Sequence, residues 1–136
     1  DNTQKFIQAH GYVYSHFGRK RRLPNVFSTD KGIASHEVRS GVNALVQSVS
    51  SDINLLGAID MQKHIVATGM DAKIFALVHD SVLAEVKEEI VEEYSAKLKE
   101  VIQKDRGLMI PGAPVGCDFD VAEDYSLGKF EKLYGI

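Results

Sequence analysis

The chain is poor in cysteine and in long apolar runs. Cys117 is its one cysteine, so an internal disulfide is excluded and a reducing compartment is favoured. Cys117 itself is expected to be a small buried residue. No apolar run reaches the roughly 20 residues that span a bilayer, and Asp1 to Lys5 lacks the basic-then-apolar layout of a secretion signal. These features predict a soluble, cytoplasmic protein without a membrane partner.

Basic residues are also in the minority. The chain has 16 lysines and arginines against 19 acidic residues, which gives a net charge of −3. A uniformly basic surface is therefore excluded, and any contact with DNA must come from a local basic patch. The 136 residues, 44% of them hydrophobic, suffice for one core. Residues 1–136 are accordingly predicted to form a single domain.

Apolar periodicity and turn residues divide the first half of the chain into elements. They predict a helix over residues 1–10 that is closed by Gly11, a strand at 12–17, a basic turn at 18–22 and a loop at 25–34. Apolar residues at three- to four-residue steps then predict a long helix over 35–56. Gly57 is a candidate interruption, and a second apolar stretch at 59–66 either continues this helix or starts a new one before Gly69.

The second half of the chain indicates a β-hairpin followed by a helix. Residues 73–78 are typical of a buried strand, 79–81 of a turn and 82–86 of the returning strand. An amphipathic helix is predicted over 88–104, with acidic residues in its first turn, and a last strand over 115–121. The predicted fold class is α+β, an antiparallel sheet with a β-hairpin that is flanked by long amphipathic helices.

Asp80 is the strongest candidate for chemistry. It follows a run of five apolar residues at the apex of the predicted hairpin, where a carboxylate is held rigidly and points outward. A hard cation such as Mg²⁺ prefers oxygen ligands of this kind. Aspartate is also an ordinary turn residue, so a purely structural role stays open. The neighbouring His79 is a candidate for orienting a phosphate, or a hydrogen-bonded structural residue.

Two further sets of polar residues suit contact with nucleic acid. Arg19, Lys20, Arg21 and Arg22 form a run of positive charge that can follow a phosphate backbone or simply be solvated. Arg39, Asn43 and Gln47 are spaced four apart and share one helix face. Side chains of these types donate hydrogen bonds to base edges, although a generic solvated face has the same pattern.

Other residues carry weaker signals. Tyr12, Tyr14 and Phe17 beside the basic run suit base stacking, but core filling is the expected role. Asp118 and Asp120 alternate onto one face of the last predicted strand, where they form a candidate metal site or an exposed acidic face.

Four segments, taken in order, resemble the C-terminal palm portion of family A (polymerase I-like) DNA polymerases, in a phage-like form. They are GYVYSHFGRKRRLPN (11–25), EVRSGVNALVQSVSSD (37–52), VHDSVLAEV (78–86) and DVAEDY (120–125). Each is weak alone, but their order and spacing agree over almost the whole chain. The resemblance implies an antiparallel palm sheet with a catalytic β-hairpin, and residues 1–24 as the return segment from the fingers.

The resemblance also implies a role for each candidate residue. Asp80 matches the second catalytic metal ligand of a site that holds two Mg²⁺ ions about 3.5–4 Å apart, and His79 would lie beside the primer terminus. The row of polar residues at 39, 43 and 47 would contact the newly formed base pairs and the template. Arg19, Arg21 and Arg22 would lie along the duplex backbone. Primer–template DNA and a dNTP are the implied partners.

The chain departs from the family pattern in two ways. Ser81 stands where the family usually has glutamate, and a serine cannot supply that negative charge. The first catalytic aspartate, in an Asp-Tyr-Ser-like strand motif, and the nucleotide-binding fingers helix are both missing upstream. We therefore expect the isolated chain to be inactive and to need a complementary polypeptide. The alternatives are a non-catalytic duplex-DNA-binding module and a remnant that self-associates through exposed apolar surface.

Overall fold

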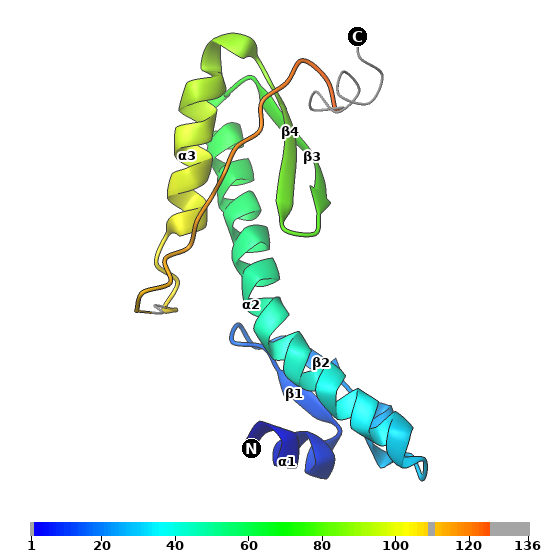
Figure 1. Ribbon diagram of the computed structural model, residues 1–136. Helices are drawn as coiled ribbons and strands as arrows, with labels where there is room; N and C mark the ends of the chain where they lie inside the picture. The colour runs from blue at the N-terminus through cyan, green and yellow to red at the C-terminus, as the bar shows by residue number, and fades with distance from the viewer. Residues whose placement is uncertain (1, 109–110, 126–136) are drawn as a thin grey trace.

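One long helix, α2 (Lys31–Thr68), connects two small hydrophobic cores in the computed structural model (Figure 1). The structure describes residues 2–108 and 111–125. The first core lies against the N-terminal half of α2 and the second against its C-terminal half. The elements of the first core are α1 (Asn2–His10), β1 (Tyr12–Tyr14), β2 (Lys20–Arg22) and η1 (Pro24–Phe27). Those of the second are β3 (Ala72–Val78), β4 (Ser81–Val86), η2 (Glu88–Ile90) and α3 (Val91–Gln103).

Helix α2 runs without a break for 38 residues. Asp30 caps its N-terminus, and the Asp30 side chain accepts hydrogen bonds from the backbone N–H groups of Gly32 and Ile33 at 2.7 and 3.2 Å. Gly69 caps its C-terminus with a left-handed φ of 67°. Of the two alternatives left open at Gly57, the continuous helix is the one observed. Gly57 is buried against Ile102 of α3, so its missing side chain allows helix packing and does not mark an end.

The first core explains two differences from the prediction. Buried side chains of α1, β1, η1 and α2 meet there, among them Ile7, Val13 and Leu23. The strand predicted over 12–17 ends at Tyr14, and the basic turn predicted over 18–22 is wrong, because Lys20–Arg22 pair with β1 as an antiparallel strand. Backbone pairing with β1 determines this strand, since its three side chains are charged and exposed.

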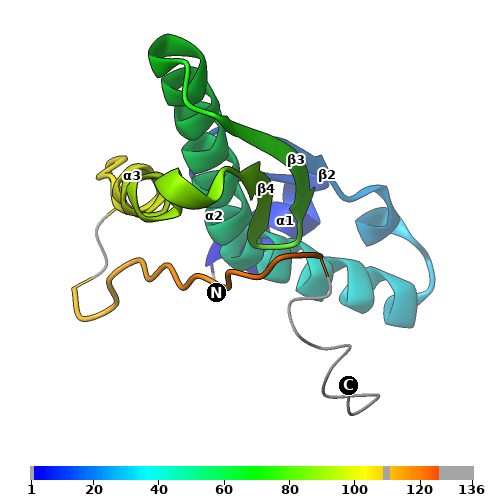
Figure 2. The ribbon, with the colours of Figure 1, turned by 90° about the horizontal axis from the view of Figure 1, so that it is seen from above.

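The second core confirms the predicted hairpin and the helix after it, but the expectation that the first strand is buried is wrong. No residue of β3 is fully buried, and Phe75 and Leu77 are 56% and 45% exposed. Met61 and Ile65 of α2 pack against Tyr94 and Leu98 of α3 and the adjoining residues of the cluster. Strands β3 and β4 are antiparallel, with a bulge between Ile74 and Ala76. Both views place α3 on one side of α2 and the hairpin on the other (Figures 1 and 2).

The strands form two separate two-stranded sheets, and the fold class is α+β, as predicted. The prediction of a last strand at 115–121 is wrong. That segment pairs with no strand in the described part of the chain. Its backbone is instead tied to α3, where the Gln103 side chain donates to the Val115 carbonyl oxygen at 2.9 Å. An alternating sequence becomes a strand only beside a free sheet edge.

Candidate metal and DNA-binding site

The tip of the second hairpin presents Asp80 and His79. Val78 pairs with Ser81, so His79 and Asp80 form a two-residue turn, and all three of the residues at 79–81 are exposed. The apolar run of β3 anchors the turn in the sheet. Asp80 thus stands at a strand-to-strand turn with its carboxylate accessible. Its role as a metal ligand stays a prediction.

His79 has an unusual backbone conformation. Its φ is 54°, and it is the one non-glycine residue with a positive φ in the described ranges. Positive φ at the first turn residue alone matches a type II′ turn, where glycine is the usual choice. A histidine there costs about 1 kcal/mol. Retaining an imidazole at this cost is consistent with a use for the side chain.

The hairpin alone does not make a complete metal site. Among residues 2–108 and 111–125, no group of three or more histidine, cysteine or acidic side chains is placed to hold an ion. Asp80 fits Mg²⁺ as a single exposed oxygen ligand. Asp118 and Asp120 lie exposed on the extended segment after α3, and the predicted strand that would have aligned them is absent.

The polar row on α2 lines a hollow in the surface. Arg39, Asn43 and Gln47 share one helix face and border a groove of about 330 Å³, together with His36 and with Arg21 of β2. All three residues of the row are exposed. The predicted common face is therefore real, while its contact with DNA stays a prediction.

Arg19 and Arg21 join this surface, but Arg22 does not. A second hollow of about 330 Å³ is lined by Arg19, Arg21, Gln47 and Ser48, and it shares Arg21 and Gln47 with the first. We call the two hollows together the polar groove. Arg21 also donates to the Ser40 hydroxyl of α2 at 3.4 Å. Arg22 borders neither hollow.

Arg21 and Arg22 lie on opposite faces of the first hairpin. Arg21 is paired with the buried Val13, whereas Arg22 is paired with Tyr12 and belongs to the other face of the hairpin. Lys20 borders the second hollow, and its ammonium lies 3.9 Å from the centre of the Tyr12 ring. Tyr14 is 51% exposed, so the expectation that it fills the core is wrong.

The structure adds a residue that the sequence analysis did not select. Asp52 of α2 is buried, and its Oδ1 accepts an ion pair from Nη2 of Arg19 at 2.7 Å. A signal was present in the sequence, because position 52 continues the apolar spacing of Leu45, Val49 and Leu56. A charged residue in an apolar stripe must find a partner when the helix packs.

The tip of the second hairpin points toward the half of α2 that carries the polar groove (Figure 1). Strands β3 and β4 run alongside α2, and the turn between them points toward the N-terminal half of the helix (Figure 1). That half carries the polar groove.

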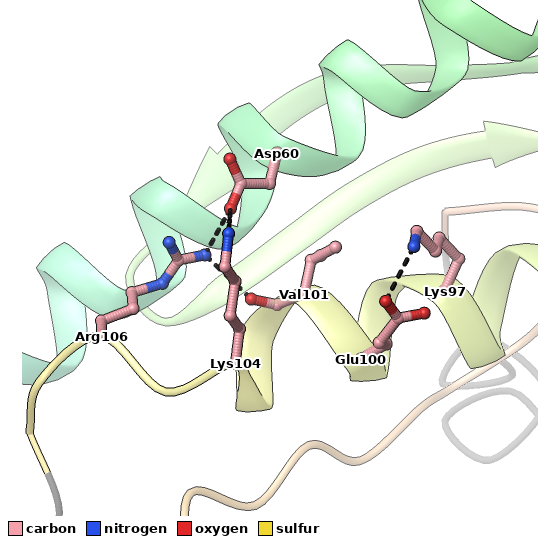
Figure 3. Close-up of polar contacts among 6 residues, drawn as sticks. All are labelled: Asp60, Lys97, Glu100, Val101, Lys104 and Arg106. Carbon is pink, nitrogen blue, oxygen red and sulfur yellow. Dashed lines mark hydrogen bonds and ion pairs between the residues drawn. The ribbon is translucent and has the colours of Figure 1, made fainter.

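A separate polar cluster holds the end of α3 against α2 (Figure 3). Arg106 Nη2 donates to Asp60 Oδ2 at 2.8 Å and to the Val101 carbonyl oxygen at 2.9 Å. Lys104 lies 3.7 Å from the same carboxylate oxygen. The Arg106 hydrogen bond, with the positive charges of Arg106 and Lys104, lowers the pKa of Asp60 below its usual value. Since Asp60 and Arg106 are both half-buried, the cluster is structural.

Comparison with known proteins identifies the family. Residues 1–126 match the sequence profile of DNA polymerase family A. The chain is 49% identical over 140 residues to a DNA polymerase of Escherichia phage T5, covering 98% of this chain and 16% of that protein. It is 27% identical to DNA polymerase I of Chloroflexus aurantiacus, over 94% of this chain and 14% of the relative. The chain belongs to DNA polymerase family A.

A solved structure supports the same assignment. The polymerase domain of Pol1 from M. smegmatis, in complex with DNA primer-template and dNTP, matches with a TM-score of 0.69 and 26% identity. The match covers 75% of this chain and 18% of that one. The α+β arrangement of hairpins and long helices is thus that of a polymerase domain, and the chain spans less than a fifth of the length of these relatives.

No helix in the described ranges is both long enough and apolar enough to cross a membrane. The letters Asp-Tyr-Ser do occur at 124–126, after the hairpin in chain order. Asp124 and Tyr125 lie in no strand, and Ser126 lies outside the described residues. The two described residues of this tripeptide thus do not form a strand motif.

Proposed function

We propose that this chain is the C-terminal palm part of a family A DNA-directed DNA polymerase, with residues 1–24 as the return segment from the fingers. In that role it supplies one Mg²⁺-binding carboxylate and part of the primer–template contact surface. The observation that carries the proposal is the exposed Asp80 at a two-residue turn that points toward the half of α2 bearing the polar groove. Membership of the family supports template-dependent nucleotidyl transfer as the reaction in which the chain takes part.

Asp80 would hold Mg²⁺ through its carboxylate oxygens. Mg²⁺ held there would supply Lewis-acid chemistry to the primer 3′-hydroxyl and charge neutralisation to the triphosphate of the dNTP. His79, at the adjacent turn position, would lie beside the primer terminus. Ser81 replaces a negative charge by a hydroxyl, so the hairpin of this chain orders metal or water less strongly than one with glutamate there.

The polar groove would receive the duplex. Arg39, Asn43 and Gln47 carry hydrogen-bond donors suited to base edges and sugars, and Arg19 and Arg21 carry positive charge suited to phosphates. Arg22 lies on the other hairpin face, so its part in binding requires DNA that passes around the edge of β2.

One carboxylate cannot organise two metal ions, so the isolated chain is expected to be inactive. The proposal requires a complementary polypeptide that carries the fingers and the first catalytic aspartate, together with primer–template DNA and dNTP. A cytoplasmic location, that of the host if the chain is phage-encoded, accompanies the proposal.

Primer extension tests the role of Asp80. The chain is mixed with a polypeptide that supplies the missing parts, a labelled primer–template, dNTPs and Mg²⁺. We expect Asp80→Ala to abolish extension, because the metal ligand is lost. The matched control is Asp71→Ala, an exposed aspartate just before β3, which should extend normally. Extension that survives Asp80→Ala would refute the role of Asp80.

Ser81→Glu tests the same hairpin in the opposite direction. Restoring the negative charge next to Asp80 should lower the Mg²⁺ concentration needed for half-maximal extension. Ser95→Glu, the same exchange on α3, is the control for added charge. An unchanged Mg²⁺ dependence would show that position 81 does not influence the metal.

The second candidate function is a duplex-DNA-binding module without catalysis, which the polar groove favours. It predicts salt-sensitive binding that does not require Mg²⁺. Arg39→Ala and Gln47→Ala should then weaken binding, while Asp80→Ala changes it little or strengthens it slightly. Fluorescence anisotropy with and without Mg²⁺ distinguishes this function from the polymerase role.

Self-association of the isolated chain is a separate expectation. Phe75 and Leu77 of β3 are 56% and 45% exposed, and exposed apolar side chains on a sheet favour association. Light scattering over a concentration series would detect it, and a constant monomeric mass would contradict it.

A further inference from the structure

Asp52 is a buried acidic group that the proposed chemistry does not use. Its side chain is 5% exposed, and its Oδ1 lies 2.7 Å from Nη2 of Arg19. Its Oδ2 is buried and has no hydrogen-bond partner in the described residues. A buried carboxylate is costly unless it is paired. Arg19 is therefore the partner that makes the burial of Asp52 tolerable.

The other member of the pair is exposed and borders the polar groove. The Arg19 side chain is 61% exposed and lines the hollow that contains Gln47 and Ser48. A guanidinium has five N–H donors, so one can engage Asp52 while others stay available to a ligand. The backbone of Arg19 is fixed too, because its N–H donates to the Ser15 hydroxyl at 3.0 Å and its carbonyl accepts from the Ser15 N–H at 2.8 Å.

The structure assigns to Asp52 the role of a positioning residue: it holds Arg19 against α2 so that the free edge of the guanidinium meets a DNA phosphate beside the polar groove. This inference rests on the proposed function, since it names how one of the phosphate contacts is oriented. Asp52 is suited to the task because it is buried on the same rigid helix as Gln47. Arg19 thereby keeps a fixed position relative to the polar row although it belongs to a different element.

The negative charge of Asp52 and its positioning of Arg19 have opposite effects on DNA binding, so a substitution can separate them. A negative charge beside the groove opposes the approach of DNA, so charge alone predicts that Asp52→Asn strengthens binding. Positioning predicts the reverse, because an amide holds a guanidinium less firmly than a carboxylate does. The sign of the change therefore separates the two effects.

The experiment measures the affinity of the full chain for a labelled DNA duplex by fluorescence anisotropy at several salt concentrations. We expect Asp52→Asn and Arg19→Ala each to weaken binding about threefold to tenfold, the size of one lost phosphate hydrogen bond. The double variant should bind no more weakly than Arg19→Ala. For both single variants, the slope of log affinity against log salt should become less steep by about 0.9, the amount expected for the loss of one phosphate contact.

Three controls make the measurement specific. Glu93→Gln removes one negative charge from an exposed position on α3 and should leave binding unchanged or slightly stronger. Arg19→Lys keeps the charge but loses the planar fork, and should bind more weakly than the unsubstituted chain. Circular dichroism and thermal melting show whether Asp52→Asn is folded. NMR of the Arg19 guanidinium reports its restricted rotation without DNA, and this restriction should be lost in Asp52→Asn.

The possible outcomes are distinguishable. Binding that weakens in Asp52→Asn and Arg19→Ala without additivity supports the assignment. Binding that weakens in Arg19→Ala but is unchanged or tighter in folded Asp52→Asn overturns it and leaves the proposed function intact. Unrestricted Arg19 rotation in the unsubstituted chain overturns it as well. A chain that binds no duplex at any salt concentration contradicts the primer–template contacts of the proposed function, and the assignment with them.

Discussion

Gly57 of α2 lies directly against Ile102 of α3. A Cβ atom at position 57 would be 2.7 Å from Cγ1 of Ile102 and 3.3 Å from its Cα. One of these atoms is backbone, and the other belongs to a β-branched side chain with little freedom in a helix. The two helices can approach this closely because position 57 has no side chain.

Gly57→Ala should therefore destabilise the protein. Alanine is favoured over glycine in a helix interior by about 1 kcal/mol, but overpacking costs about 1–3 kcal/mol. We expect a net loss of about 1 kcal/mol in the free energy of unfolding, measured by urea denaturation. The control is Ala67→Gly at an exposed position of α2, where the glycine should be the less stable residue. A more stable Gly57→Ala variant would show that α3 can move away freely.

The Asp60 cluster predicts a stability difference that depends on pH. Because the pKa of Asp60 is lowered in the folded protein, the unfolded chain takes up the proton first as the pH falls. The cluster's contribution is thus complete above the ordinary aspartate pKa of about 4 and is lost as the pH falls through the lower folded value. We expect Asp60→Asn to be less stable by about 1 kcal/mol at pH 7 and nearly equal to the parent at about pH 2.

Urea denaturation in steps from pH 7 to pH 2 checks this dependence. Glu100 offers a comparison, since its pKa is lowered by an exposed ion pair with Lys97. Glu100→Gln should change stability less, because solvent screens exposed pairs. A constant difference between Asp60→Asn and its parent at all pH values would contradict the assigned role of Arg106.

Tyr94 is predicted to gain nothing from its hydroxyl. The residue is buried, and the hydroxyl oxygen has no hydrogen-bond partner in the described residues. Tyr94→Phe should therefore be equal to the parent or more stable, by up to about 1 kcal/mol at pH 7. Tyr14→Phe, at an exposed position, is the control and should have no effect.

The same residue gives a prediction at alkaline pH. Burial raises the pKa of Tyr94 to about 12, so the unfolded chain ionises first as the pH rises through about 10. As the pH rises from about 10 to about 12, the free energy of unfolding of the parent should therefore decrease relative to that of Tyr94→Phe. Thermal melting at pH 7 and pH 11 measures the difference. A less stable Tyr94→Phe at neutral pH would indicate that the hydroxyl is in fact bonded.

His79 should show opposite effects on stability and activity. Its φ of 54° is unstrained for glycine, so His79→Gly should stabilise the hairpin by about 1 kcal/mol. Under the proposed function the same change should slow primer extension, since the imidazole is lost. Lys87→Gly, where φ is −61°, should destabilise and serves as the control. Extension that is unaffected by His79→Gly would restrict His79 to a structural role.

The sequence predicted those elements whose signals are local. The hairpin at 72–86 was found because an apolar run, a polar turn and a second apolar run succeed one another directly. Strand β2 was missed because Lys20–Arg22 has no β-type residues, and its pairing with β1 determines its structure. The role of Gly57 stayed open because its partner, Ile102, is distant in the sequence.

In the candidate site, too, only the features with local sequence signals were predictable. Helical spacing sufficed to place Arg39, Asn43 and Gln47 on one face. The register of β1 and β2 decides which of Arg21 and Arg22 is paired with the buried Val13, and no sequence pattern predicts that register. The ion pair of Asp52 with Arg19 joins a helix to a hairpin turn, so it became visible only in three dimensions.

The unbroken course of α2 restricts how this part of the polymerase can vary. Each residue added to a helix rotates the downstream part of the chain by about 100° and advances it by about 1.5 Å. A single insertion between Gln47 and Gly57 would rotate the hairpin and α3 relative to the polar groove, even if every side chain were retained. Insertions and deletions should therefore be tolerated in the turns of this chain and excluded from the middle of its longest helix.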